Sequence, residues 1–429
     1  TYQDIPNSNK TTTQVQSLTN PVGSYTYTYD ANGNIASENV TINYMKPRSR
    51  SISYEYDELN RLKRVNNASR YYTLVFEYDA RGNILAQKYY DYTEGELGQL
   101  KSTDTYTYTA GWNDLLTSFR GESITYDEIG NPVQYLGDTL TWTEGRRLAS
   151  LSRPFPGKPE NQTIYTYEYN AAGQRTSKTK TYSTTGESIT TEFIYEGDLL
   201  VGQKTSDGKG DMTFLHDDTG AYIGLIYEGV EYYYMKNVQG DIIGIVDAEG
   251  VIQAVYTYEP FGKLFSIETK SGFLRYDGDW SVGGMNPIRY RGYYYDYDTK
   301  LYYLNSRYYD PYVGRFISSD TTDILTSTPM EVTNKNLYAY CDNNSIVRAD
   351  TDGQFWNFVV GAAIGAVSVY VGDVIENIAE GKSGLDILKP TSSVGTYLGA
   401  AVSGMIPGGG LASMIARPII STGIKYSVD

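Results

Sequence analysis

Polar and apolar residues alternate with a period of two over short runs that recur along most of the chain. Tyr25-Thr26-Tyr27-Thr28-Tyr29 is one such run, and Tyr106-Thr107-Tyr108 is another. A side-chain period of two with strong β-formers on both faces is typical of a β-strand. The runs lead into turns of the form Asp-x-x-Gly-Asn, in which Gly or Asn can take a positive φ. The pattern therefore predicts repeated β-hairpins.

The hairpin unit reads Tyr-(Asp/Asn/Glu)-x-x-Gly-(Asn/Gln), with some variation at its end. Clear copies end at Asn34, Arg61, Asn83, Asn131 and Gln174. Degenerate copies from Tyr106 to Leu116 and from Leu140 to Leu151 fill the two longer gaps, so the period is roughly 20 to 25 residues, as in repeat architectures. An isolated hairpin is marginal in water, but stacked hairpins can pair into one continuous sheet. We therefore expect a mainly β body built from repeats.

Composition narrows the possible functions. The chain has 429 residues, 45 of them Tyr, and a net charge of -15. A sequence pI near 4.7 argues against a nucleic-acid-binding surface, which would be basic. A single Cys and a single His exclude an intramolecular disulfide and a His/Cys zinc site. Because Thr1 begins inside the pattern, we expect the C-terminal part of a longer protein whose targeting signal lies elsewhere.

The most specific stretch runs from Asn286 to Gly353. It reads NPIRYRGYYYDYDTKLYYLNSRYYDPYVGRFISSD up to Asp320, and NLYAYCDNNSIVRADTDGQ begins at Asn336. This stretch resembles the RHS repeat-associated core domain, which closes the YD-repeat array in bacterial RHS proteins, wall-associated proteins, toxin-complex C subunits and teneurins. The matching residues are Tyr290, Gly292, Tyr293, Tyr294, Asp296, Leu301, Tyr302, Tyr303, Arg307, Tyr308, Tyr309, Asp310, Pro311, Gly314, Arg315, Phe316, Ser318, Asp320, Asn336, Tyr338, Tyr340, Asn343, Asn344, Asp350 and Gly353.

The resemblance implies a fold that composition could not give. In this family a long β-sheet strip winds spirally into a hollow shell, and the core domain curls inward to plug one end. A variable toxin follows the plug and is held inside the shell. The implied division is a YD/RHS repeat array over residues 1–285, the core over 286–353 and a pre-toxin segment over 354–429. A spiral sheet would also remove long exposed strand edges.

The tail after Gly353 has a different composition. The run from Phe355 to Gly372 is uncharged and rich in Gly and Ala, and its 18 residues lie at the lower limit for a membrane-spanning helix. Three interpretations stay open: a helical pre-toxin segment packed within the shell, a helix that enters a target membrane during delivery, and an ordinary α-hairpin domain. In each of them the expected structure is helical.

Candidate chemistry centres on two carboxylates. In related shells the core domain acts as an aspartyl self-protease, and the resemblance places its carboxylates at Asp320 and Asp350, with the cleaved bond after Gln354. Two close carboxylates could share a proton and activate water. This sequence departs from the family pattern, because Thr351 and Gln354 replace Pro and Leu of the DPxGL-type motif. The alternative is a structural role, in which both Asp side chains cap turns of the plug.

Other candidates have stronger structural interpretations. His216 is expected on a strand without a nucleophile nearby, and Cys341 is expected as a buried thiol on a strand of the plug. The Asp-rich turn from Tyr293 to Lys300 could hold Ca²⁺, but it lacks the spaced ligands of an EF-hand. We expect no cofactor and no metal.

The sequence therefore predicts a secreted or surface-displayed RHS-repeat shell that encloses and delivers a toxin of its own polypeptide, whose effector domain would follow Asp429. An immunity protein and a carbohydrate or cell-surface receptor are possible further partners, and the run from Phe355 to Gly372 is the expected membrane contact. One alternative is an adhesin or carbohydrate-binding array, which would carry its Tyr and Trp on the outer face. Another is a self-processing aspartyl protease module.

Overall fold

The computed structural model describes residues 2–4, 11–45, 47–274, 280–320, 336–350, 353 and 356–358. Its main element is one antiparallel sheet in which each strand from β3 to β26 pairs with the next along the chain. The strands are β3 (Ser17–Asn20), β4 (Gly23–Tyr29), β5 (Ile35–Ile42), β6 (Arg48–Tyr56), β7 (Leu62–Asn67), β8 (Tyr72–Tyr78), β9 (Ile84–Tyr92), β10 (Leu97–Tyr108), β11 (Leu116–Phe119), β12 (Glu122–Tyr126), β13 (Pro132–Tyr135), β14 (Asp138–Thr143), β15 (Arg147–Phe155), β16 (Lys158–Tyr169), β17 (Arg175–Tyr182), β18 (Ser188–Glu196), β19 (Leu199–Thr205), β20 (Met212–His216), β21 (Tyr222–Tyr227), β22 (Val230–Lys236), β23 (Ile242–Asp247), β24 (Ile252–Tyr258), β25 (Leu264–Thr269) and β26 (Gly272–Phe273). The predicted hairpin repeat is confirmed, and we call this sheet the wall.

Two short elements accompany the wall. A small separate sheet pairs β1 (Tyr2–Asp4) with β2 (Thr11–Val15), and one 3-10 turn, η1 (Ala68–Arg70), joins β7 to β8. The degenerate repeats found in the sequence also form hairpins, because β10 pairs with β11 and β14 pairs with β15.

The repeated Asp forms each turn. In the first clear copy, Asp30 Oδ1 accepts hydrogen bonds from the backbone N–H of Asn32 at 2.9 Å and of Asn34 at 2.8 Å. Gly33 between them has φ +84, a conformation that favours glycine. Asp79 and Asp127 accept the same bonds in their own turns. The motif therefore specifies an Asx-type turn.

In most of the hairpins the Tyr just before the turn fastens one hairpin to the one before it. Tyr56 donates its hydroxyl hydrogen to the Ile35 carbonyl at 2.8 Å, and Tyr108 donates to the Ile84 carbonyl at 2.8 Å. Trp142 replaces Tyr in a degenerate copy and donates from Nε1 to the Pro132 carbonyl at 2.7 Å. The same clasp recurs at Tyr29 to Val15, Tyr78 to Leu62, Tyr126 to Leu116, Tyr169 to Leu148, Tyr195 to Arg175 and Tyr258 to Ile242.

The residue that ends each motif links neighbouring turns along one rim of the wall. Asn34 Nδ2 donates to Asn60 Oδ1 at 3.0 Å, and Asn83 Nδ2 donates to the Asn113 carbonyl at 3.1 Å. Asn131 and Gln174 reach the carbonyls of Gly145 and Gly197 in the same way. The Asn or Gln that ends these motifs therefore links its own turn to the next one, and we call this row of turns the turn rim.

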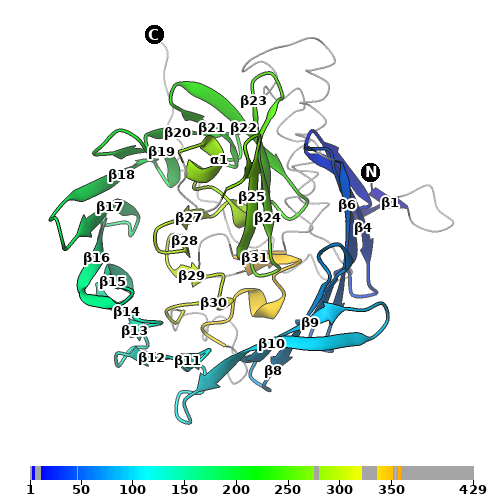
Figure 1. Cartoon of the computed structure of the whole chain (residues 1–429), viewed down its shortest axis with the longest axis horizontal. Coiled ribbons are helices and arrows are strands. Elements are labelled where there is room, and N and C mark those ends of the chain that lie inside the picture. The colour runs from blue at the N-terminus through cyan, green and yellow to red at the C-terminus, as the bar shows by residue number, and fades with distance from the viewer. Residues whose placement is uncertain are drawn as a thin grey trace, which may run out of the picture.

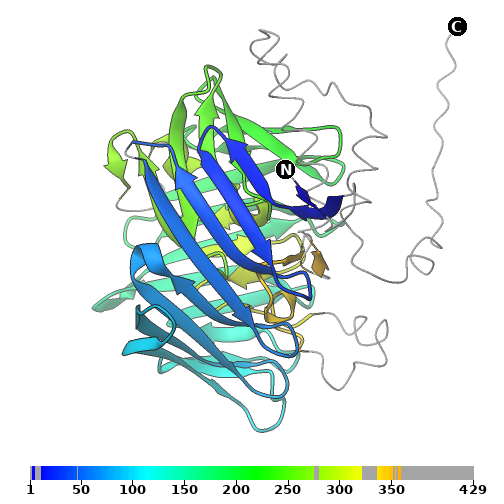
Figure 2. The same ribbon diagram turned by 90° about the vertical axis from the view of Figure 1, so that its right-hand side faces the viewer.

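The wall curls until its two ends overlap. Figure 1 shows the blue first strands alongside the green last strands, and Figure 2 shows the first strands as a broad tilted sheet. Side chains join the two ends: Arg48 Nη2 contacts Glu268 Oε1 at 2.5 Å, and Arg50 Nη1 contacts Thr257 Oγ1 at 3.2 Å. A Cβ added to Gly244 would lie 2.5 Å from Val22 Cγ2, so β23 packs directly against the start of the wall.

The described residues between 280 and 358 form a compact plug inside the curled wall (Figure 1). Its elements are α1 (Val282–Met285), η2 (Tyr290–Gly292), β27 (Tyr294–Asp296), β28 (Leu301–Tyr303), β29 (Tyr308–Asp310), β30 (Arg315–Phe316), η3 (Cys341–Asn343) and β31 (Arg348–Asp350), and β31 pairs with β32 (Trp356–Phe358). Stacked and tilted rings fill the plug: Tyr340 lies 4.3 Å from Tyr309 between ring centroids, and Tyr302 lies 4.9 Å from Tyr295. Aromatic burial of this kind dominates core energetics.

Side chains of the plug bind the turn rim at many successive hairpins. Asn344 Nδ2 donates to Asn34 Oδ1 at 3.0 Å and to the Asn60 carbonyl at 2.7 Å. Further contacts join Asn343 to Gly82, Asn336 and Arg315 to Asn83, Tyr338 to Gly130, Tyr303 to Gly173, and Tyr302 to Gly262. The plug is thus held by the same turns that define the repeat.

Two sequence expectations for the C-terminal region are wrong in detail. Cys341 is buried as expected, but it begins the 3-10 turn η3 and has φ +54, so it is not on a strand. Trp356–Phe358 was expected to be helical and instead forms strand β32. Residues 359–429, where the remaining helix was predicted, lie outside the described residues.

Candidate functional site

The two predicted carboxylates contact the same nitrogen of one arginine. Arg307 Nη2 is 2.9 Å from Asp320 Oδ2 and 3.2 Å from Asp350 Oδ2. All three residues belong to the plug and are no more than 6% exposed. Because a guanidinium between two carboxylates favours their ionised form and compensates their burial, Arg307 allows both to remain close together in the interior.

Arg307 is fixed by three further contacts. Its Nη1 donates to the Leu337 carbonyl at 3.1 Å, and its guanidinium carbon lies 3.6 Å from the centroid of the Phe316 ring. Its Nε donates to the carbonyl of Gly353. That carbonyl belongs to the peptide bond between Gly353 and Gln354. The arginine therefore joins the two carboxylates to the point where the chain leaves the plug.

Asp350 also holds the backbone at this point. Its Oδ1 accepts the N–H of Gly353 at 2.8 Å, and its own N–H donates to the Tyr293 hydroxyl at 2.9 Å. Gly353 has φ +77, and a Cβ there would lie 2.7 Å from the Leu304 carbonyl oxygen. Only glycine fits this turn, so the sequence Asp-x-x-Gly places the last peptide of the plug against the carboxylates.

The predicted cleavage position is the bond after Gln354. Gln354 and Phe355 lie outside the described residues, so the bond after Gln354 is not placed. The carbonyl that Arg307 holds is one residue earlier, at Gly353. Two buried carboxylates and a guanidinium around a peptide carbonyl can orient water and stabilise the charge of an oxyanion. The same carboxylates can instead cap turns of the plug, which is the structural alternative.

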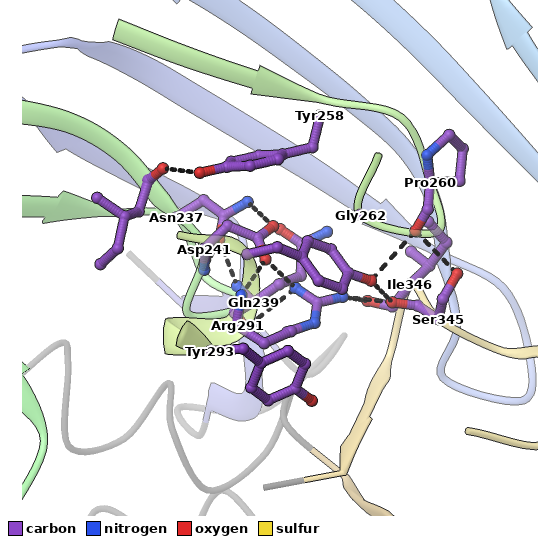
Figure 3. Close-up of polar contacts among 12 residues, drawn as sticks. Asn237, Gln239, Asp241, Tyr258, Pro260, Gly262, Arg291, Tyr293, Ser345 and Ile346 are labelled. Carbon is purple, nitrogen blue, oxygen red and sulfur yellow. Dashed lines mark hydrogen bonds and ion pairs between the residues drawn. The ribbon is translucent and has the colours of Figure 1, made fainter. Parts of the chain in front are cut away.

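A second polar cluster joins the plug to the wall, and sequence reasoning missed it (Figure 3). Arg291 Nη1 lies 2.9 Å from Asp241 Oδ1 and donates to the Gln239 carbonyl at 3.0 Å, while Nη2 donates to the Ser345 carbonyl. Asp241 is the last residue of the Asn-x-x-Gly-Asp turn before β23. The first residue of that turn uses the same Asx geometry. The turn motif that contains Asp241 was visible in the repeat, but Arg291, the charged partner of Asp241, lies 50 residues further along the chain.

This cluster borders a cavity of about 80 Å³ between the overlapping ends of the wall and the plug. Burial raises the pKa of the Glu38 carboxyl on its lining, and the nearby Arg50 partly opposes that rise. Gln239 Oε1 and Arg50 Nε have no hydrogen-bond partner among the described residues. The volume and the polar lining suit a small group of water molecules.

A buried charge network is the other contact that sequence reasoning missed. Asp296 is fully buried, and its carboxylate contacts Arg175 Nη1 at 2.5 Å and Lys178 Nζ at 2.8 Å. Lys178 and Lys180 also contact Asp298, at 3.3 and 2.7 Å. The Asp-rich turn considered for Ca²⁺ is therefore paired with cations of strand β17.

The remaining candidate residues lie apart from this site. His216 ends strand β20 as expected, and its ring centroid lies 4.5 Å from that of Tyr222. Burial lowers the pKa of His216 and raises that of the Cys341 thiol. The described part of the chain contains no group of three or more potential metal ligands, and none of its helices has the length and apolar character needed to cross a bilayer.

A curled antiparallel sheet of tyrosine-clasped hairpins around an aromatic plug defines a YD-shell. The family model described as Teneurin YD-shell matches residues 7–346, and the chain belongs to this family.

Several relatives with curated descriptions are toxins or nucleases. The chain is 30% identical over 290 residues to the tRNA3(Ser)-specific nuclease WapA of Bacillus spizizenii, an alignment that covers 65% of this chain and 11% of that protein. It is 24% identical to toxin subunit YenC1 of Yersinia entomophaga, covering 67% of this chain and 30% of the subunit, and 24% identical to toxin protein Tse5 of Pseudomonas aeruginosa, covering 74% and 26%. The chain thus spans less than a third of the length of these relatives.

Among solved structures, the crystal structure of TcdB2-TccC3-Cdc42 has a TM-score of 0.61 to this chain at 20% identity, covering 78% of this chain and 17% of that one. The crystal structure of TcdB2-TccC3 has a TM-score of 0.57 at 19% identity, covering 82% and 18%. These likenesses support the shell fold independently of the family match.

Proposed function

We propose that this chain is the closing end of a secreted or surface-displayed container that encloses a toxin segment of its own polypeptide. The observation that carries the proposal is the position of the plug. It lies within the curled wall, binds the turn rim from Asn34 to Gly262, and passes the chain onward at Gly353. In this proposal the closure keeps the segment after Gly353 on the inner side of the wall.

The direction of the aromatic side chains also supports a container. Tyr25, Tyr27, Tyr106, Tyr165 and Tyr167 of the wall are buried in the same cluster as the tyrosines of the plug. The adhesin alternative requires Tyr and Trp gathered on the outer face. Tyr71 and Trp280 are strongly exposed, but Tyr71 lies in the turn between β7 and β8 and Trp280 lies just before α1, so neither occupies a repeated Tyr position.

The names of the relatives agree with this function, because WapA, YenC1 and Tse5 are described as a nuclease, a toxin subunit and a toxin protein. From these relatives we infer for this chain only the class of function, which is delivery of a toxin linked to the shell. An immunity protein and a carbohydrate or cell-surface receptor are further proposed partners, which the described residues do not identify.

The cluster around Arg307 supports self-cleavage as a second activity of the same container. In this proposal one carboxylate of Asp320 and Asp350 takes a proton from a water molecule, whose oxygen bonds to the peptide carbonyl carbon. The C–N bond breaks as the same carboxyl passes the proton that it took from water to the leaving nitrogen. The products are a carboxyl terminus on the plug and a free amino terminus on the released segment.

Limited proteolysis with mass spectrometry tests the container. We expect residues 355–372 to resist cleavage in the native protein, while the exposed turn around Glu94 serves as the internal standard for protease activity. Loosening the plug with Arg175→Ala is expected to increase cleavage of that segment. Cleavage as fast as at Glu94, or binding of the closed protein to liposomes at neutral pH, would contradict the container and favour the adhesin alternative.

A further inference from the structure

The plug does not fill the space inside the wall completely. A cavity of about 510 Å³ remains between the inner face of β13–β15, the start of β25 and the plug strands β27–β29. Its apolar lining includes Leu136, Leu151, Leu264, Leu301 and Pro311. This volume is within the range of about 300 to 1,000 Å³ in which proteins bury organic ligands, so it has room for several residues of an extended peptide.

The charged side chains on the lining are already engaged with protein partners. Arg153 holds Asp138 through two nitrogens, with Nη2 2.6 Å from Oδ2, and it also donates to the carbonyls of the plug turn. Lys263 Nζ lies 3.2 Å from Glu259 Oε1. Because burial of an additional charge without a partner is costly, the cavity favours an uncharged occupant.

One polar group on the lining lacks a partner. Thr299 is 3% exposed, and its Oγ1 has no hydrogen-bond partner among the described residues. A hydroxyl both donates and accepts, as does a peptide group with its N–H and carbonyl. An occupant that combines apolar side chains with a peptide backbone therefore satisfies both the apolar lining and this hydroxyl.

We propose that this cavity binds a few consecutive residues of an uncharged, small-residue-rich polypeptide, and that the segment 359–372 of this chain supplies them. The inference rests on the proposed container function and identifies where inside it the enclosed segment is held. The sequence VVGAAIGAVSVYVG over these residues contains no Asp, Glu, Lys or Arg, and its Gly and Ala allow close approach of the backbone.

The point at which the chain leaves the plug is close to the cavity. The backbone of Gly353 packs against Leu304 and Ser306, at the end of β28. Leu301, at the start of the same strand, lines the cavity. Three strand residues span about 10 Å, a distance that the residues after Phe358 can cover easily.

Photo-crosslinking in the full chain tests the assignment. Tyr312 lines the cavity and is replaced by p-benzoylphenylalanine, a larger aromatic residue that forms covalent crosslinks on illumination. In the matched control Tyr71, which is 77% exposed, is replaced in the same way. We expect mass spectrometry to detect crosslinks from position 312 to residues 359–372 and none from position 71. Leu264 provides a second probe position if the Tyr312 variant does not fold.

A substitution within the segment adds a chemical test. Ala363→Asp introduces a charge and should lower the crosslink yield several-fold, whereas Ala363→Ser should leave it nearly unchanged. Crosslinks to residues 373–429 instead would contradict residues 359–372 as the occupant, but they would agree with the container function. Absence of crosslinks together with rapid proteolysis of residues 355–372 would overturn both.

Discussion

Tyr56 and Ile35 are separated by 21 residues, yet the Tyr56 hydroxyl lies 2.8 Å from the Ile35 carbonyl oxygen. The bond crosses from one hairpin to the previous one, and it recurs throughout the wall. The strand ladders alone would leave the hairpin ends free to splay, so the tyrosine bonds fix the spacing of the turns. The plug then binds those turns.

Removing one clasp should destabilise the wall without changing its fold. Tyr56→Phe deletes the hydroxyl and leaves the Ile35 carbonyl without that donor, so the free energy of unfolding should fall by about 1 kcal/mol. Urea denaturation followed by tyrosine fluorescence or circular dichroism measures the change. Tyr71→Phe, at a side chain that is 77% exposed, is the control and should have almost no effect. Equal effects of the two substitutions would contradict the role of the clasp.

Self-cleavage should depend on the carboxylates beside Arg307. Asp350→Asn keeps the size of the side chain and its bond to Gly353, but it removes the charge, so the processed fragment should disappear. Intact mass spectrometry detects a fragment that begins at Gln354 or Phe355. The control is Asp342→Asn, because Asp342 contacts Arg348 outside the Arg307 cluster and is 36% exposed. A single uncut species from the unmodified chain would leave Asp320 and Asp350 as structural residues.

The charge network between β17 and the plug should contribute strongly to stability. Asp296→Ala leaves Arg175 and Lys178 buried without their partner, and loss of one member of a buried pair typically costs about 3 to 5 kcal/mol. Glu144→Ala, which removes a largely exposed partner of Arg147, should cost less than about 1 kcal/mol. Chemical denaturation of the two variants distinguishes these values. A small effect of Asp296→Ala would mean that the plug is held by its other contacts.

The same network predicts a loss of stability in acid. Although burial alone would raise the pKa of Asp296, Arg175 and Lys178 hold it below its usual value. The stability it contributes is therefore fully present above the unfolded pKa of about 3.9 and is lost as the pH falls towards the folded value. The difference in unfolding free energy between wild type and Asp296→Asn should shrink on acidification below about pH 4. A difference that stays constant would rule out this charge effect.

Asp310 should have the opposite pH dependence. Burial raises the pKa of this carboxyl to about 6, with a partial opposing effect of the Tyr135 hydroxyl, which donates to it at 2.9 Å. Its contribution is therefore present below the unfolded pKa of about 3.9 and is lost as the pH rises through about 6. In the wild type the free energy of unfolding should fall by up to about 3 kcal/mol between these two pH values, and Asp310→Asn should remove this decrease. An unchanged profile from pH 4 to 7, measured by urea denaturation, would contradict the prediction.

The fold was largely predictable because the repeat carries its own local chemistry. Asp30, Gly33 and Asn34 form their turn through contacts within five residues, and such contacts leave a sequence signature. The acceptor of Tyr56 is a backbone carbonyl, which every residue possesses, so its position could not be read from residue types.

The candidate site was predictable only in part for the same reason. The family resemblance identified Asp320 and Asp350, which the structure brings to one nitrogen of Arg307. Arg307 was visible as a matching residue, but its contact with both carboxylates depends on how the plug folds. Arg175 and Asp296 were missed because they are 121 residues apart, and only the placement of the plug against β17 brings them together.

The tyrosine clasp also gives the wall a direction. Most motifs reach back to the hairpin made before them, so a growing chain can fasten most new units onto a completed neighbour as they emerge. The plug comes later in the sequence and needs turns from Asn34 to Gly262 as its binding surface. Assembly can therefore proceed vectorially from the N-terminal side, with closure as the final step, after the walls that receive the following segment are already in place.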